Sequence, residues 1–185
     1  MGQPTKVHHS YETYCELPDD GNRYEVIEGE LYVSPAPTRR HQELSKRLEY
    51  HLYRWAEVEG RRGEVFYAPF DVILADDTVL QPDLIYVREE RRDRFSERGL
   101  EGAPDLVVEI LSPSTRARDR GLKRETYARH GVSELWLVDP EANAVEVFRL
   151  DGGRLVLAGR FGPQDRLESL SVAGLVVPLD DVFRA

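Results

Sequence analysis

Apolar residues recur at the spacing of a helix over one long segment of the chain. From Thr38 to Gly60 they fall three or four positions apart, as on the buried face of an amphipathic helix. The residues on this spacing are Leu44, Leu48, Leu52 and Trp55. Thr38 can cap the first turn through its hydroxyl, and Gly60 can end the last one. We therefore predict a helix of about six turns over residues 38–60.

Shorter apolar runs, rich in β-branched residues, predict strands. They cover residues 64–74, with Pro69 as a candidate break, and residues 84–87, 106–111 and 135–138. The last three runs are almost continuously apolar, which is typical of strands buried on both faces of a sheet. The segment 88–102 is strongly charged and is either a short solvated helix or a loop.

Turn-forming residues outline two hairpins. One covers residues 24–33 and turns at Gly29, and the other covers residues 145–158 and turns at Gly152. A second helix is predicted over residues 119–130. The order of hairpin, long helix, three strands, second helix, strand and hairpin predicts an α/β fold in which helices cover a mixed sheet.

Composition is that of a globular protein. The chain has 185 residues, 41% hydrophobic and 32% charged, and no linker or repeat divides it, so residues 1–185 are expected to form one domain. No stretch approaches the roughly 20 apolar residues of a membrane span, and Met1–Lys6 lacks the apolar run of a signal peptide. We therefore expect a cytoplasmic protein without a membrane partner. A single cysteine, Cys15, excludes an internal disulfide and a cysteine zinc cluster.

The charge balance restricts how nucleic acid could bind. A net charge of −9 argues against attraction over the whole surface, so any such binding must be local. Among 25 basic residues only Lys6, Lys46 and Lys123 are lysines. Each lysine is therefore a candidate for a specific role, although genome composition or a hot habitat explains the same bias.

Two carboxylates interrupt the apolar strands. Asp83 opens one predicted strand, and Glu109 lies inside the next. If the two strands are neighbours, these carboxylates converge. A carboxylate within an apolar strand needs a cation or hydrogen bonds, and Mg²⁺ accepts one or two carboxylates, a carbonyl and several waters. An arginine partner or a sheet edge facing water is the alternative explanation of Glu109. Asp71 and Asp105 are weaker candidates, because an aspartate at the mouth of a strand is commonly a turn or cap residue.

Lys123 lies inside the second predicted helix. Asp119 and Tyr127 stand four residues before and after it, on the same face. Its ammonium could orient a hydroxide and neutralise charge that develops on a phosphate. The alternative is an exposed ion pair with Asp119, which would contribute little energy.

Several longer stretches form a pattern that covers nearly the whole chain. They are Tyr24–Glu30, His41, Pro82-Asp83, Val108–Thr115, Lys123 with Tyr127, and Gly131–Pro140. Together they resemble the Uma2 family, which is assigned to the PD-(D/E)XK nuclease superfamily. The resemblance implies a restriction-endonuclease-like core of helix, three strands, helix and strand, with the N-terminal and C-terminal hairpins added to it.

The resemblance also implies a catalytic site. Asp83, Glu109 and the main-chain carbonyl of Leu111 would bind Mg²⁺, for which Mn²⁺ could substitute. The superfamily places a lysine two residues after the acidic ligand, where this chain has Leu111. The resemblance implies that Lys123 supplies the catalytic ammonium from the following helix instead.

Three further residues match family positions and are expected to support the site. They are Glu30, His41 and Tyr127. His41 is equally explained as a histidine on the surface or in the first turn of a helix, and Glu30 as an exposed acid beside a turn. These alternatives stay open on the sequence alone.

The function that the resemblance implies is a Mg²⁺-dependent endonuclease with DNA as its substrate. Arginines could supply local phosphate contacts. One group is Arg116, Arg118, Arg120 and Arg124, and the other is Arg88, Arg91, Arg92, Arg94 and Arg98. Acids interleave the second group, so a solvated face explains it equally well. A homodimer is expected by analogy, because two sites related by a two-fold axis can cut both strands. The alternative function is a non-catalytic module that binds nucleic acid or protein on the same fold.

Overall fold

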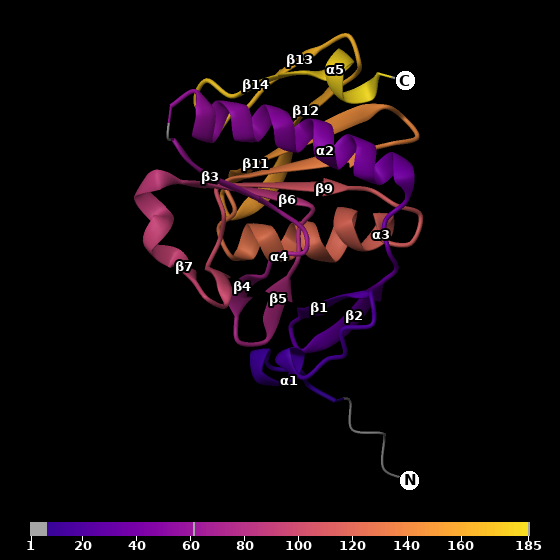
Figure 1. Ribbon diagram of the computed structural model, residues 1–185, viewed down its shortest axis with the longest axis vertical. Coiled ribbons are helices and arrows are strands. Elements are labelled where there is room, and N and C mark those ends of the chain that lie inside the picture. Colours follow the sequence, from indigo (N-terminus) through magenta and orange to yellow (C-terminus); the bar gives the residue numbers. More distant parts are fainter. Residues whose placement is uncertain (1–6, 61, 185) are drawn as a thin grey trace.

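Two six-stranded mixed sheets form the framework of the protein, and the helical segment of residues 116–129 lies between them (Figure 1). The computed structural model describes residues 7–60 and 62–184. The stretch Met1–Lys6, on which the signal-peptide prediction rests, lies outside the described residues. No helix within the described ranges is long and apolar enough to cross a membrane.

The central sheet has the strand order β12-β11-β10-β9-β6-β3. Its strands are β3 (Gly63–Tyr67), β6 (Leu84–Arg88), β9 (Leu106–Ile110), β10 (Glu134–Asp139), β11 (Ala144–Asp151) and β12 (Arg154–Phe161). β9 and β10 run parallel, and the other neighbours run antiparallel. The buried strands predicted from the three continuous apolar runs are confirmed as β6, β9 and β10, and the predicted C-terminal hairpin as β11 and β12.

The second sheet, here the N-terminal sheet, has the order β2-β1-β5-β4-β8-β7. Its strands are β1 (Arg23–Ile27), β2 (Glu30–Ser34), β4 (Val72–Ala75), β5 (Thr78–Leu80), β7 (Phe95–Ser96) and β8 (Gly99–Glu101). The sequence predicted the β1–β2 hairpin but not a separate sheet. The run at 64–74 divides beyond Tyr67, near the cis peptide between Ala68 and Pro69, so that β3 joins one sheet and β4 the other. β5, β7 and β8 are too short to show a periodicity in sequence.

Helices cover both faces of the central sheet (Figure 1). On one face, α2 (Arg39–Tyr53) continues through a π-helical turn, η1 (Arg54–Val58), and the Thr38 hydroxyl accepts a hydrogen bond from the His41 N–H. On the other face, α3 (Arg116–Arg118), a π-helical turn η3 (Asp119–Lys123) and α4 (Arg124–Arg129) follow one another without a break. This helix begins at Arg116, three residues before the predicted start at Asp119, because a hydrogen bond from the Arg116 N–H to the Ser112 carbonyl already forms the first turn.

Smaller elements complete the fold. They are α1 (Tyr11–Cys15), the 3₁₀ helix η2 (Glu89–Arg94), the hairpin β13 (Arg166–Glu168) with β14 (Val176–Pro178), and α5 (Leu179–Phe183). The charged segment 88–102, for which sequence left a helix or a loop open, contains η2 followed by β7 and β8.

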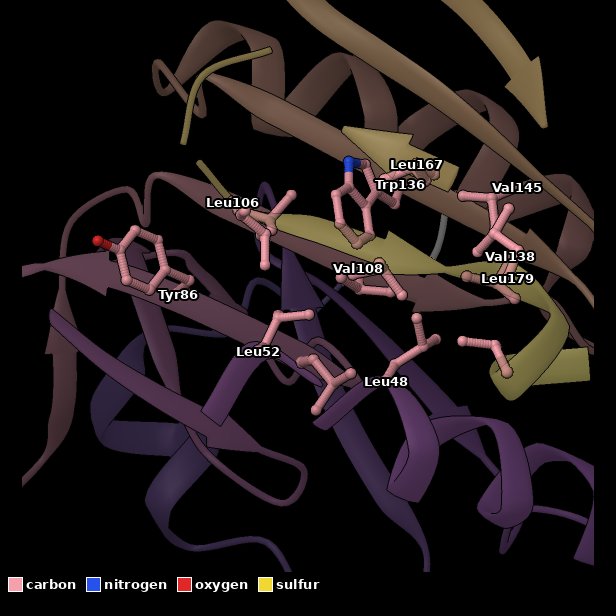
Figure 2. Close-up of a cluster of buried hydrophobic side chains, with 14 of the residues drawn as sticks. Leu48, Leu52, Tyr86, Leu106, Val108, Trp136, Val138, Val145, Leu167 and Leu179 are labelled. Carbon is pink, nitrogen blue, oxygen red and sulfur yellow. The ribbon is translucent and has the colours of Figure 1, made fainter. Parts of the chain in front are cut away.

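The apolar stripe of α2 packs on the central sheet, as predicted. Leu48 and Leu52 contact a core that includes Leu106 and Val108 of β9 and Trp136 of β10 (Figure 2). All five side chains are almost fully buried. The face of β9 that carries Leu106 and Val108 is therefore committed to hydrophobic packing.

Side chains alternate along β9, so the residues between these point to the opposite face. There Val107 and Leu111 join a second hydrophobic cluster with Tyr127 of α4. Glu109 lies between them in sequence and shares their face. This alternation directs the Glu109 carboxylate toward the helix that carries Lys123.

Candidate active site

The register of the central sheet brings the two predicted acidic ligands together. β6 and β9 are antiparallel neighbours, with Leu84 opposite Val108. One step along the same register, Asp83 stands opposite Glu109. Both carboxylates are buried, at 3% and 2% exposure. The expectation that they converge across neighbouring strands is therefore confirmed.

Lys123 reaches the same point from the π-helical turn η3. Its Nζ lies 2.6 Å from Oε1 of Glu109 and 2.9 Å from Oε1 of Glu25. The Oδ1 atom of Asp119 is farther away, at 3.8 Å, and the Lys123 side chain is 2% exposed. An exposed pair with Asp119, the alternative that the sequence left open, is thus excluded.

Leu111 occupies the position where the superfamily pattern has a lysine. Its side chain is buried in the cluster around Tyr127, and its N–H donates to the Val138 carbonyl. Leu111 directly follows β9, and by the alternation along that strand its side chain lies on the same side as Glu109, so an ammonium arriving from η3 can take the place that a strand lysine would hold. The role of the Leu111 carbonyl as a metal ligand stays a prediction.

Asp83 is held by three groups. Arg23 donates from both terminal nitrogens to Oδ1 at 2.9 Å, the Ile110 N–H donates to Oδ2 at 2.7 Å, and Nε2 of His41 lies 3.1 Å from Oδ2. Burial raises the pKa of Asp83, but the hydrogen bond with His41 and the charge of Arg23 outweigh it and bring the pKa to about 2. Asp83 is therefore an anion at neutral pH. His41 is buried rather than exposed on the helix, which favours its supporting role.

Glu109 has the opposite electrostatic state. Tyr127 donates its hydroxyl to Oε1 at 2.5 Å, which places this predicted supporting residue in the site. Burial raises the pKa of Glu109 to about 8, and although Lys123 opposes this, the charges of Asp119, Asp83 and Glu25 reinforce it. The pKa of Lys123 is also raised, because the nearby carboxylates outweigh the effect of burial. The lysine is consequently a cation throughout the physiological range.

Glu25 is a site residue that the sequence reasoning missed. It lies on β1, is 1% exposed, and accepts hydrogen bonds from Lys123 Nζ and from the Gln81 N–H. Arg118 lies 3.5 Å from its second oxygen. The signal was available, because Glu25 precedes two apolar residues inside a predicted strand, as Glu109 does.

Most of these residues line a cavity of about 180 Å³, although Leu111 and Tyr127 are not among its lining residues. Its carboxylates are Glu25, Asp83, Glu109 and Asp119, and its cationic side chains are Arg23, Arg118 and Lys123. Four carboxyl groups thus share the cavity with three cationic side chains, one fewer than would balance them if all four were ionised. The excess negative charge is consistent with the raised pKa values of Glu109 and Asp119, and a bound cation would balance it.

The donor chemistry of the cavity fits a hard divalent cation. No cluster of three or more histidine, cysteine or acidic side chains in the described part of the chain is arranged to hold a metal ion. Mg²⁺ does not need such a cluster, because it binds through one or two carboxylates and keeps several waters. Asp83 and Glu109, with a carbonyl, match that requirement.

The remaining predicted residues lie differently. Glu30 is on β2, accepts a hydrogen bond from the Tyr32 hydroxyl and is not among the residues lining the cavity. Arg118 lines the cavity and also donates to Ser34. Arg124 stacks over the ring of Phe148.

Two of the predicted phosphate-binding arginines have acidic partners outside the cavity. Arg116 pairs with Asp139, and Arg120 pairs with Glu146. In the second arginine group, Arg88 and Arg91 pair with Asp105, which is fully buried. Asp105 is therefore the anchor of an ion-pair cluster rather than a simple turn residue.

The other weak candidate, Asp71, accepts hydrogen bonds from the Tyr14 hydroxyl and from the side chain of Gln81. It lies outside the cavity that contains Glu109.

In the second arginine group, Arg92 pairs with Glu64 on β3 and Arg98 lies over the ring of Tyr11.

Comparison with known proteins bears on the family and the fold of the chain. Residues 11–180 match the model of the Uma2 family, which is described as "putative restriction endonuclease". An uncharacterized protein of Synechocystis is 30% identical over 166 residues, which cover 88% of this chain and 84% of that protein. A crystal structure from Anabaena variabilis, titled a "putative nuclease belonging to DUF820", superimposes with a TM-score of 0.79 at 22% identity, over 95% of this chain and 97% of the other.

Proposed function

Because this chain belongs to the Uma2 family, and has the fold of a nuclease relative, we propose that it is a Mg²⁺-dependent endonuclease that hydrolyses phosphodiester bonds of DNA. The observation that carries the proposal is the position of Lys123. Its ammonium lies against Glu109, on the strand beside Asp83, within one cavity. An acidic pair can hold a metal that activates water, and an ammonium beside it can stabilise negative charge on a phosphate.

The metal would be held by Asp83, Glu109 and the carbonyl of Leu111, and Mn²⁺ would substitute for Mg²⁺. When bound, the ion supplies a Lewis acid for the phosphate and makes water a stronger nucleophile. The protein contributes an anion of fixed orientation at Asp83, because Arg23 and His41 hold both of its oxygens. The strong electrostatic preference of this carboxylate for its ionised form keeps it available as a ligand at neutral pH.

Lys123 acts by charge rather than by proton transfer. Its raised pKa keeps it protonated, so it cannot serve as a general base near neutral pH. A fixed ammonium beside the reacting phosphate stabilises the negative charge that develops in the transition state. Glu25 accepts its hydrogen bond and thereby fixes its position.

Donors for the phosphate surround the same cavity. Arg118 lines it, and so do the hydroxyl-bearing residues Ser112, Ser114 and Thr115, which precede the helix that begins at Arg116. Hydroxyls, a guanidinium and the first N–H groups of a helix are the usual contacts of a phosphate in proteins. They provide local attraction that the net charge of −9 does not.

The test is cleavage of plasmid DNA by Lys123→Arg and Lys123→Ala. The alanine variant removes the ammonium that neutralises three buried carboxylates, so it should destabilise the fold as well as the reaction. The arginine variant keeps the charge but not the compact shape of the ammonium. We expect the arginine variant to fold and to cleave DNA at about one hundredth of the wild-type rate or below.

Arg149→Ala is the control, because this exposed residue on β11 lies away from the cavity. Thermal melting establishes that each protein is folded before rates are compared. Wild-type rates from a folded Lys123→Arg protein would contradict the proposed role. Titration calorimetry with Mg²⁺ and Mn²⁺ measures metal binding, which separates catalysis from the alternative function. A wild-type protein that binds DNA but neither metal would be a non-catalytic module.

A two-fold dimer is part of the proposal, since two sites are the simplest means of cutting a duplex. Sedimentation equilibrium of the wild-type chain tests it directly. A monomer at the concentrations that support cleavage would remove the dimer from the mechanism.

A further inference from the structure

A second cavity, of about 750 Å³, adjoins the candidate active site. Its size falls within the range of roughly 300–1,000 Å³ that is typical of small-molecule sites. The two cavities share Arg23, His41, Asp83 and residues 35–37 as walls. A ligand bound in the larger cavity would therefore lie next to a phosphate bound in the smaller one. We call this larger cavity the lateral pocket.

One wall of the lateral pocket is a polar stripe of α2. Gln42, Ser45, Lys46 and Glu49 are spaced by three or four residues and all line the pocket. Within the described residues, the side chains of Gln42, Lys46 and Glu49 have no hydrogen-bond or ion-pair partner, which leaves them available to a ligand. Burial raises the pKa of Glu49, as expected of a carboxyl group in a concave site.

Another part of the wall offers a flat surface. Tyr67, at the end of β3, lines the pocket with its side chain 57% exposed. A tyrosine ring on the wall of a cavity can stack on a nucleobase, and such stacking does not depend on which base is present. The hydroxyl of Tyr14 and the amide of Gln81 also line the pocket, where they bond to Asp71.

The charges of the lateral pocket indicate which part of a nucleotide it accepts. Asp19, Glu49 and Asp71 line it, and among its cations Arg23 is already paired with Asp83. Lys46 remains as a cation without an acidic partner in the described ranges. Three acids against one available cation disfavour a phosphate. They suit an uncharged group that presents hydrogen-bond donors, such as the amino group of a base.

We propose that the lateral pocket binds the nucleobase next to the scissile phosphate, turned out of the base stack. The inference rests on the proposed function in placing that phosphate in the neighbouring cavity. A base can enter such a pocket only from a single strand or from an unpaired site in a duplex. A duplex substrate must therefore unpair at the base beside the cleaved bond, whereas single-stranded DNA enters without that cost. Carboxylates accept hydrogen bonds from exocyclic amino groups, so cytosine and adenine bind better than thymine.

Binding to short fluorescent oligonucleotides tests the proposal without requiring cleavage. Anisotropy is measured with the wild-type chain at one salt concentration, in Ca²⁺ and again in EDTA, for single strands of dC, dA or dT and for a duplex. The single strands should bind more tightly than the duplex, and dC should bind about tenfold more tightly than dT. Tyr67→Leu should weaken binding of every single strand about tenfold, because a stacking partner is lost.

Matched controls for both kinds of variant are available on α2. Tyr50 is 56% exposed and lies outside the pocket, so Tyr50→Leu should bind as the wild type does. Glu49→Gln should reduce the preference for amino-bearing bases, whereas Glu43→Gln, at a residue outside the pocket, should not. Thermal melting of each variant shows whether it is folded.

The outcomes separate this inference from the proposed function. Equal affinity for duplex and single strand, an unaltered Tyr67→Leu protein, or no binding by the wild type in either condition would overturn the lateral pocket as a base site. Cleavage of plasmid with Mg²⁺ would still stand in the first two cases. Base-dependent binding that requires Tyr67, without any cleavage in Mg²⁺, would support the pocket and contradict the nuclease proposal.

Discussion

Replacement of Glu109 by glutamine should stabilise the protein while removing its activity. The pKa of this buried carboxyl is about 8, against 4.5 for its ordinary value. Each pKa step of one corresponds to about 1.4 kcal/mol, so the ionised form costs the folded state up to about 5 kcal/mol above pH 8. Glutamine retains the shape and can still accept the Tyr127 hydrogen bond. Allowing for rearrangement of the buried charges, we expect a gain of about 2–5 kcal/mol.

The pH dependence gives the prediction its sign. Because the folded-state pKa of Glu109 is raised, the contribution of this group to stability is fully present below pH 4.5 and is lost as pH rises toward 8. The variant lacks this loss. The difference in unfolding free energy between the two proteins should therefore be small near pH 5 and reach its plateau above pH 8.

Urea unfolding at both pH values measures the difference, and the buried Trp55 and Trp136 provide the fluorescence signal. Glu168→Gln, at an exposed position on β13, is the control and should leave the profile unchanged. Above pH 8, added Mn²⁺ should stabilise the wild type more than Glu109→Gln, because the variant lacks one of the two carboxylate ligands. Parallel pH profiles for the two proteins would refute the electrostatic argument, and equal stabilisation by Mn²⁺ would remove Glu109 from the metal site.

Three further predictions concern the core and the residues around Lys123. Leu48→Ala removes a fully buried side chain and should cost about 2–5 kcal/mol in urea unfolding, against a change within about 0.5 kcal/mol for the exposed Tyr50→Ala. Glu25→Gln should lower kcat with little change in KM, because Glu25 positions Lys123 and does not bind substrate; an unchanged kcat would contradict this. The ionised Asp83 stabilises the wild type above pH 3.8, and this stabilisation is lost as pH falls through about 2, so Asp83→Asn should lack it. Identical acid-unfolding curves for the two proteins would show that Asp83 is not held as an anion.

The sequence predicted those parts of the fold that have a long or uninterrupted pattern. The stripe through Leu48 repeats over many residues, and β9 is apolar from end to end except at Glu109, so both stood out. The N-terminal sheet as a whole did not, because it joins three short local hairpins through the pairings β1–β5 and β4–β8, which connect segments far apart in sequence.

The candidate site divides in the same way. Glu109 was found because a carboxylate inside an apolar run must have a partner. Glu25 has the same property, but its strand is short and its partner is 98 residues away. The pairing of Arg120 with Glu146 likewise joins residues that only the folded chain brings together. Long-range electrostatics is the part of the site that local sequence does not contain.

The π-helical turn η3 suggests how the site keeps a lysine that comes from a helix instead of from the strand. Such a turn corresponds to one extra residue within an α-helix, and it often occurs where side chains must be redirected. Here it carries Asp119 and Lys123, both buried. Deleting Gly121 from this turn would leave every charged group in the sequence and make the helix more regular, yet it would rotate the helix on one side of the deletion relative to the other. The site therefore depends on the spacing of residues along this helix as well as on their identity. A homologue with one residue fewer in the helix could have all of the same side chains and still lack the site.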